Sequence, residues 1–264
     1  MFRHRTWVTR GCRDRDPAPG GERCPLGATM LSTTGHDQLP EIWCGCHGGP
    51  HGSVRIAEHP YGVALTVEIR YGGVDILADP GTYCYAGDPP WPLYLWSRRA
   101  HARETEVLDH GDVAKWAAEH DGCLWLDSPV RHRRSVLLDR ASRIVDIVDQ
   151  IDGGNRDICP AFYLGPEVQV ELGEFCAFLS WPGAATPGAA RMELPPGFSW
   201  SLHQTDAACA ILGRGGCVAG VPLATRLEFD DTEISPKVAF IQSASSSASG
   251  ICRENEQDNQ AEAI

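Results

Sequence analysis

The sequence predicts an all-β protein, an antiparallel β-sandwich (supersandwich-like) of many short strands, within its 264 residues. Short runs rich in Val, Ile, Leu and aromatic residues recur along the chain, and Gly, Asp, Asn and Pro separate them, as in sandwich folds. Helical periodicity is almost absent, since only 112–119 has weak helical character. Strands therefore do not alternate with helices, which excludes a parallel sheet built from βαβ units.

The composition divides the chain into three parts. Residues 1–40 mix Arg, Asp, Gly and Pro without a sustained period, which predicts a disordered or unrelated N-terminal segment. Residues 41–243 carry the β pattern and form the predicted sandwich domain. Residues 244–264 are Ser-rich at first and polar throughout, which predicts a disordered tail.

The first elements are expected around 42–44, at 63–69 and at 74–79. The second and third are joined by Tyr71-Gly72-Gly73, a hairpin-turn signal, and Asp79-Pro80-Gly81 ends the third because proline cannot continue a ladder. Residues 88–96 are rich in aromatic residues and proline, which indicates a loop. Further strands are predicted at 105–108, 123–126, 130–138, 143–151, 161–164, 168–172, 175–181, 191–194, 199–203, 207–212, 223–229 and 237–242.

Two turn signals stand between these strands, Asp121-Gly122 and Asp152-Gly153-Gly154-Asn155. The segment from Arg131 to Ile151 resembles a long hairpin with one polar face.

Charge and hydropathy exclude several function classes. The formal charge is −12, whereas nucleic-acid binding needs a concentrated basic surface. No apolar stretch is long enough to span a membrane. The N-terminus lacks the apolar centre of a secretory signal, so the chain as written is expected in the cytoplasm.

The sequence contains 11 cysteines and no repeated CxxC pair. We expect mostly free thiols, with Cys84, Cys159, Cys176 and Cys209 as small core residues. Cys44-Gly45-Cys46-His47 is the one local cluster with some resemblance to a metal site.

Three polar residues stand at the ends of predicted strands: His59, Asp79 and His101. Imidazole and carboxylate groups are suitable zinc ligands, so a metal site is one interpretation. A hydrogen-bonded structural histidine and a turn-forming aspartate are the alternative. A metalloenzyme of another β fold that uses these three residues is a further hypothesis.

Three segments resemble the C-terminal β-sandwich domain of heparinase II/III-like polysaccharide lyases: His59–Leu65, Ala78–Tyr85 with its DPGTYCY sequence, and Ser97–Ala102 with its Arg-Ala-His sequence. The resemblance extends from Ile42 to Leu172 and more weakly to Gln242. It implies β-elimination at a uronic acid, in which a base removes the proton beside a neutralised carboxylate and an acid protonates the leaving oxygen.

The resemblance also implies roles for individual residues. His59 matches the histidine at the catalytic site, and Asp79 and His101 match two zinc ligands. Tyr61 stands where the family has the third ligand, and Val63 and Ala102 also depart from the motif. Zinc is therefore possible by resemblance with an incomplete site, because structural zinc usually takes four protein ligands.

In the family, the sandwich follows an α/α toroid that supplies much of the catalytic machinery, and the full-length proteins are periplasmic or secreted. Residues 1–40 cannot encode that toroid, so we expect a truncated and degenerate form with little activity alone. Its expected partners are an acidic polysaccharide and a missing toroid domain.

The alternative is a non-catalytic carbohydrate-binding or assembly module. Trp91, Tyr94 and Trp96 could stack on sugar faces. Arg99, two residues before His101, could contact an acidic sugar.

Overall fold

The computed structural model describes residues 28–33, 39–48, 65–78, 102–123, 129–154, 156–204 and 209–230. Every regular element within these ranges is a β-strand, and every pairing between them is antiparallel, which confirms the predicted fold class. The same ranges contain no helix that is long and apolar enough to cross a membrane.

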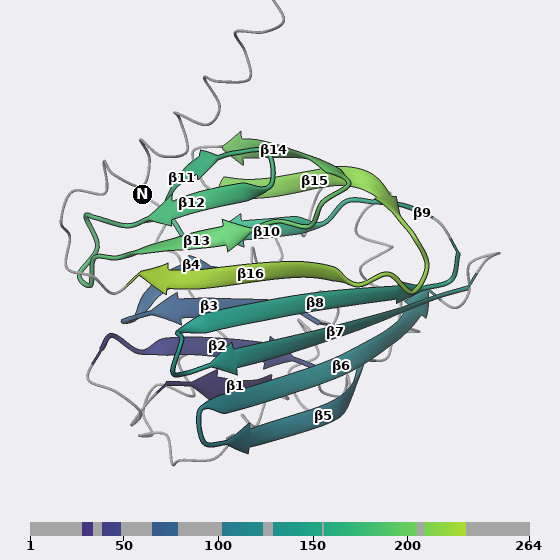
Figure 1. Ribbon diagram of the computed structural model, residues 1–264, viewed down its shortest axis with the longest axis horizontal. Helices are drawn as coiled ribbons and strands as arrows, with labels where there is room; N and C mark the ends of the chain where they lie inside the picture. Colours follow the sequence, from purple (N-terminus) through teal and green to yellow (C-terminus); the bar gives the residue numbers. More distant parts are fainter. Residues whose placement is uncertain are drawn as a thin grey trace, which may run out of the picture. The chain divides into compact units, whose positions relative to one another are not determined.

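The strands form two sheets of eight (Figure 1). In the first sheet, β9 pairs with β15, and the remaining strands lie in the order β1 (Ala28–Ser32), β2 (Ile42–His47), β3 (Val67–Tyr71), β4 (Val74–Leu77), β10 (Ala161–Leu164), β15 (Cys209–Cys217) and β14 (Phe198–Gln204). The short strand β9 spans Arg156–Ile158.

The second sheet has the order β11 (Gln169–Leu172), β12 (Cys176–Ser180), β13 (Ala189–Glu193), β16 (Leu223–Asp230), β8 (Ile144–Asp152), β7 (Val130–Asp139), β6 (Val113–Cys123) and β5 (Ala102–His110). The four strands β5 to β8 are consecutive in sequence and in space, so this half of the sheet is a simple meander.

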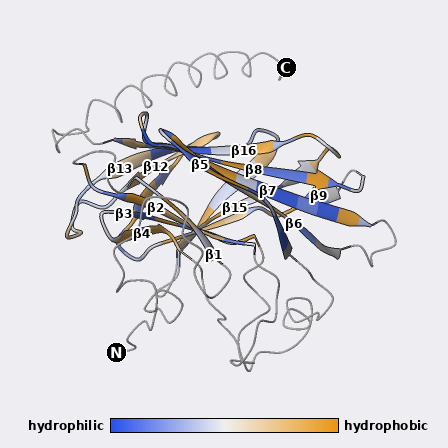
Figure 2. Cartoon of the chain, turned by 90° about the horizontal axis from the view of Figure 1, so that it is seen from below, coloured by the Kyte–Doolittle hydropathy of each residue, from blue (hydrophilic) through white to orange (hydrophobic). Residues whose placement is uncertain are grey.

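The two sheets lie as two layers (Figure 2), and their inner faces share one hydrophobic core. Tyr71 of the first sheet stacks on Phe229 of the second, with ring centroids 5.7 Å apart, and meets Trp181 edge-on at 5.3 Å. Along β8, β12 and β16, alternate residues supply the core, as a half-buried strand requires, whereas β2 and β3 are buried at nearly every residue. Its largest fully buried side chains are Trp116, Trp181, Leu31, Ile42, Ile69, Ile76, Leu138, Ile147, Leu179, Met192, Ile211 and Leu227.

Both hairpin predictions are confirmed. β3 and β4 are joined by Gly72 and Gly73, both with positive φ (54° and 86°), a conformation that glycine adopts without steric cost. β7 and β8 form the predicted long hairpin. The bend after β8 includes Gly153 and Gly154, again as predicted.

Three predictions are wrong in detail. β1 lies within 1–40, so the sheet begins earlier than residue 41. The segment 112–119 forms most of β6 instead of a helix, because Ala114, Trp116 and Ala118 alternate into the core between β5 and β7. Asp121-Gly122 is not a turn: it lies inside β6, where the register with β7 shifts. β9 was not predicted.

The predicted strand at 237–242 and the predicted tail lie outside the described residues. Asn155 and residues 124–126 do so as well.

Candidate functional site

Four points of the chain lie at one end of their strands, which we call the Leu65 end: His47, Leu65, Ala78 and Ala102. The Leu65 amide donates to the His47 carbonyl (2.8 Å), and the Ala78 amide donates to a carbonyl of β10 (3.0 Å). Ala102 begins β5, whose Glu104 accepts a hydrogen bond from Thr29 at the adjacent end of β1. The described segments on both sides of 49–64, and those on both sides of 79–101, therefore end or begin at this end of the sandwich.

All of the residues that the sequence proposes for the site lie outside the described residues. His59, Tyr61 and Val63 precede Leu65. The remainder stand between Ala78 and Ala102: Asp79, Trp91, Tyr94, Trp96, Arg99 and His101. The structure thus places their immediate chain neighbours and not the predicted residues themselves.

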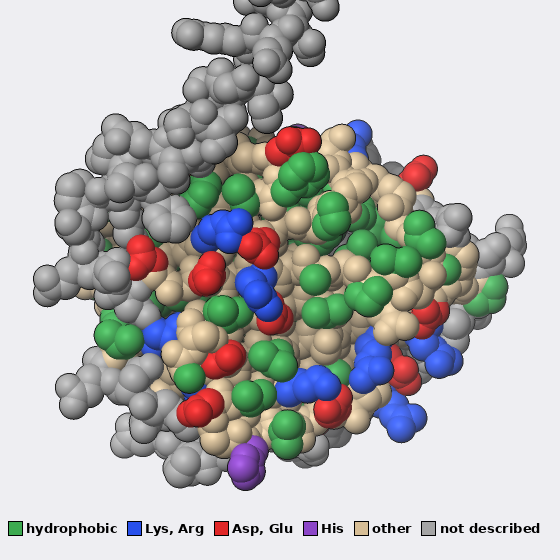
Figure 3. All heavy atoms as spheres, in the orientation of Figure 1, with side chains coloured by type: hydrophobic (Ala, Val, Ile, Leu, Met, Phe, Trp, Pro, Cys, Tyr) green, Lys and Arg blue, Asp and Glu red, His purple; other side chains and the backbone are tan. Residues whose placement is uncertain are grey.

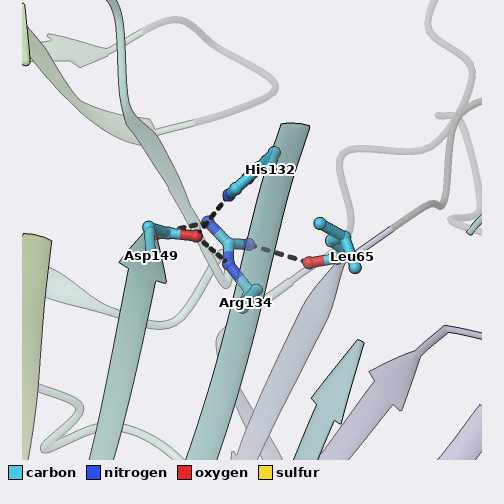
Figure 4. A network of polar contacts seen from close by, with 4 residues as sticks. All are labelled: Leu65, His132, Arg134 and Asp149. Carbon is cyan, nitrogen blue, oxygen red and sulfur yellow. Dashed lines mark hydrogen bonds and ion pairs between the residues drawn. The ribbon is translucent and has the colours of Figure 1, made fainter. Parts of the chain in front are cut away.

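A buried polar network, which the sequence did not predict as functional, lies at this end (Figure 4). Arg134 on β7 and Asp149 on β8 are direct cross-strand partners. The Arg134 guanidinium donates to both carboxylate oxygens, through Nε at 2.7 Å and through a terminal nitrogen at 2.9 Å. His132 Nε2 lies 2.6 Å from Asp149 Oδ1. The result is a carboxylate bound on two sides.

The same guanidinium joins the two sheets. Its other terminal nitrogen donates to the Leu65 carbonyl at 2.8 Å. Leu65 has φ 60°, the left-handed region that a residue with a side chain seldom adopts. Two hydrogen bonds, one to His47 and one from Arg134, hold the backbone in this conformation just before β3 begins. Strained backbone of this kind persists only where the surroundings determine it, and it is common at functional sites.

Electrostatics keep Asp149 ionised. Burial by itself raises the pKa of the Asp149 carboxyl. The positive charge of Arg134 and the hydrogen bonds from His132 and Arg134 outweigh that effect and hold the pKa well below its usual range. For Arg134, burial lowers the pKa, but the neighbouring carboxylate more than reverses this, so the pKa is raised. The pair is therefore charged at any ordinary pH.

Asp149 also determines which nitrogen of His132 carries a proton. An ionised carboxylate can only accept, so Nε2 must be the donor in both the neutral and the protonated imidazole. Nδ1 is then the nitrogen that gains or loses a proton. With 32% of its side chain exposed, His132 is the most accessible member of the network.

A second histidine and a second carboxylate share the inner face of this sheet. His120 on β6 pairs directly with His132, and His120 in turn pairs with Ala102 on β5. Directly opposed residues point to the same face, so the two imidazoles are neighbours. Glu104 accepts hydrogen bonds from Thr29 and from the Trp116 indole. The inner face of β5 to β8 is therefore polar at the Leu65 end and apolar beyond it.

The described residues do not supply the ligands of a metal site. No group of three or more His, Cys, Asp or Glu side chains among them could hold a metal ion. The Cys44-Gly45-Cys46-His47 cluster is not one, because both thiols are buried in the core. Burial raises the pKa of Cys44 to about 12 and also raises that of Cys46, so neither is a thiolate.

The remaining described cysteines are free thiols, as predicted. Cys159 is exposed and not a core residue, whereas Cys176 and Cys209 are half-buried.

The sequence did contain a signal for the network. Arg131-His132-Arg133-Arg134 and Asp149-Gln150-Ile151-Asp152 are complementary stretches on the two arms of a predicted hairpin. The predicted strands 130–138 and 143–151 place a turn between them, but a shift of one residue changes every pairing. The register that pairs Arg134 with Asp149 therefore follows only from the observed turn at 140–143.

One comparison with known proteins shows the family, and another supports the fold. The sequence pattern of the family described as "Heparinase II/III-like, C-terminal" matches residues 45–201, more than half of the chain. No curated protein matches the sequence.

Seventeen chains of solved structures match the structure. One of them, titled "Crystal Structure of Heparinase III", superposes with a TM-score of 0.59 at 14% identity over 84% of this chain. This chain spans 38% of the length of that structure. At this identity, the superposition supports the sandwich fold alone. The sequence match over 45–201 establishes more: the chain belongs to the heparinase II/III-like C-terminal domain family.

Proposed function

We propose that this chain is the sandwich part of a polysaccharide lyase for uronate-containing glycans, and that alone it turns over little substrate. The observation that carries the proposal is the Leu65 end. At this end, the described residues that flank the family's histidine and aspartate motifs, Leu65 and Ala78, lie at the same end of the sandwich as the Arg134–Asp149–His132 network. Family membership supports the reaction class.

In β-elimination, a base removes the C5 proton of the uronic acid, the C4–C5 double bond forms, and the C4–O bond breaks. The leaving oxygen then takes up a proton. By family resemblance, His59 belongs to the catalytic site. This chain spans 38% of the length of the heparinase III structure. We expect low turnover from this chain alone, because loss of members of a catalytic unit costs orders of magnitude in rate.

Zinc does not fit the residues present. Asp79 and His101 match two family ligands, but Tyr61 offers a phenol with an ordinary pKa of about 10 in place of an imidazole. Among the described residues, no group of three or more His, Cys, Asp or Glu side chains could hold a metal ion. We propose that zinc binds weakly or not at all, and we assign it no step in the reaction.

The proposal is tested by incubating the purified chain with heparan sulfate, alginate and hyaluronan while following the ultraviolet absorbance of the unsaturated product. The expected result is binding of at least one glycan with negligible turnover, and metal analysis of chelator-free protein should show substoichiometric zinc. Rapid turnover by the chain alone would contradict the proposed low activity. If the chain bound none of the three glycans, the proposed function as part of a polysaccharide lyase would be contradicted.

Binding without turnover, even when a toroid domain from a family member is supplied, would favour the carbohydrate-binding module. In that case a Trp91→Ala variant should bind more weakly than the parent.

A further inference from the structure

The His132 imidazole is oriented by the protein but has an unused nitrogen. Nε2 is committed to Asp149, and Asp149 is itself fixed by Arg134. Among the described residues, nothing bonds to Nδ1, and about a third of the side chain is exposed. An imidazole that is fixed on one side and exposed on the other is arranged to meet a ligand.

The fixed charges around His132 cancel one another. Arg134 is neutralised by Asp149 within the network. On either side of His132 along β7, Arg131 lies opposite Asp152 on β8, and Arg133 lies 3.8 Å from Glu106 on β5. Because Arg134 and Asp149 carry opposite charges, protonation of His132 would give this three-residue network a net positive charge.

Within the described part of the chain, four other titratable or charged groups face His132. His120 lies on β6, Asp149 on β8 and Arg134 on β7 itself, and Glu104 lies two strands away on β5. His120 and Glu104 are engaged in interactions of their own. On the outer face of this sheet, basic and acidic side chains are interspersed (Figure 3), and their ion pairs do not form a basic patch.

We propose that His132 is a ligand-contacting residue that binds the carboxylate of an acidic sugar through Nδ1, with Asp149 and Arg134 as its positioning residues. This inference rests on the proposed function for the class of ligand. The protonated ring donates a charge-assisted hydrogen bond from Nδ1 to an ionised carboxylate, whereas the neutral ring presents a lone pair there and repels it. Affinity should therefore be higher when the His132 ring is protonated than when it is neutral.

The experiment uses the full chain, with ¹⁵N-labelled histidine, and oligosaccharides of hyaluronan, heparan sulfate and alginate as probes. Imidazole ¹⁵N shifts should report Nε2 as the protonated nitrogen of the neutral His132 ring, because Nε2 faces the Asp149 carboxylate. Addition of the oligosaccharide that binds should shift the Nδ1 resonance. Binding should be about tenfold tighter in acidic than in alkaline buffer, the size expected for one charge-assisted bond.

His132→Gln should weaken binding at low pH by a similar factor and remove the pH dependence, while urea unfolding shows that the variant is folded. His203→Gln is the matched control, because His203 is an exposed histidine on β14 in the other sheet. An oligosaccharide whose carboxyls are reduced to alcohols should bind without the pH dependence.

Three outcomes would overturn the inference. Glycan binding that is unchanged in His132→Gln excludes His132 and leaves the proposed function intact. Equal pH dependence with the reduced oligosaccharide excludes the carboxylate. Absence of binding to every probe at both pH values rejects the inference together with the proposed function.

Discussion

Two arginines of one hairpin hold opposite ends of the sandwich, and they differ in what surrounds them. Arg134 lies on β7 at the Leu65 end, and Arg140 lies in the turn after β7 at the other end. Each donates to a backbone carbonyl of the other sheet, of Leu65 and of Ser32 respectively. Each also binds a carboxylate of its own sheet, Asp149 or Asp109.

The difference is in exposure and in the third partner. Arg140 has 4% of its side chain exposed, and its remaining nitrogen donates to the Gly111 carbonyl at 2.7 Å. Arg134 has 22% exposed, and its carboxylate partner also binds a half-exposed histidine. Both arginines bind only backbone and carboxylate acceptors, so both stabilise the fold. Arg134 differs because its carboxylate partner also orients a partly exposed histidine, which can contact a ligand.

The largest expected effect is on Arg140. We expect Arg140→Met to destabilise the domain by about 3–5 kcal/mol, because it removes one partner of a buried, hydrogen-bonded charge pair. Urea unfolding measures the change. A loss below about 1 kcal/mol in the free energy of unfolding would show that Arg140 does not stabilise the fold more than Arg134 does.

A smaller loss is expected for Arg134→Met, about 1–3 kcal/mol, because this guanidinium is more exposed. The Leu65 backbone should become less protected at the same time. Hydrogen exchange of the Leu65 amide, compared with that of amides in β12, distinguishes local loosening from global unfolding. Uniform exchange throughout the sandwich would contradict a local role.

The pH dependence of stability should differ between parent and Asp149→Asn. The pKa of Asp149 is lowered in the folded state, so its ionised form contributes stability above the unfolded-state value of about 4. That contribution is lost as the pH falls below about 4 toward the folded-state pKa. Unfolding measured from about pH 6 to pH 2.5 should therefore show a smaller decline in the variant, and equal declines would contradict the assignment.

The smallest effect is expected at an exposed ion pair. Arg226 on β16 meets Asp146 on β8 at 2.7 Å, with about half of its side chain in solvent. Arg226→Met should change the free energy of unfolding by less than about 1 kcal/mol, as exposed pairs usually do. It is the matched control for both buried arginines.

The sequence by itself determined the class of fold and two of the hairpins, β3–β4 and β7–β8. Gly72-Gly73 and Asp152-Gly153-Gly154 act within a few residues, and the period of two along 130–151 reflects one wet and one dry face. These signals are local, so they are legible without the partner strands. The motifs that identify the family are local for the same reason.

Only the tertiary structure decided the rest. Residues 112–119 have helical propensity, yet β5 and β7 on either side make them a strand, because tertiary pairing overrides a weak local preference. The contacts of Arg134 with Leu65 and of Arg140 with Ser32 join residues 69 and 108 positions apart. Such contacts depend on how one sheet packs on the other, which no stretch of sequence encodes alone. That packing is what brings His132 and Asp149 to the end of the sandwich where the family motifs begin and end.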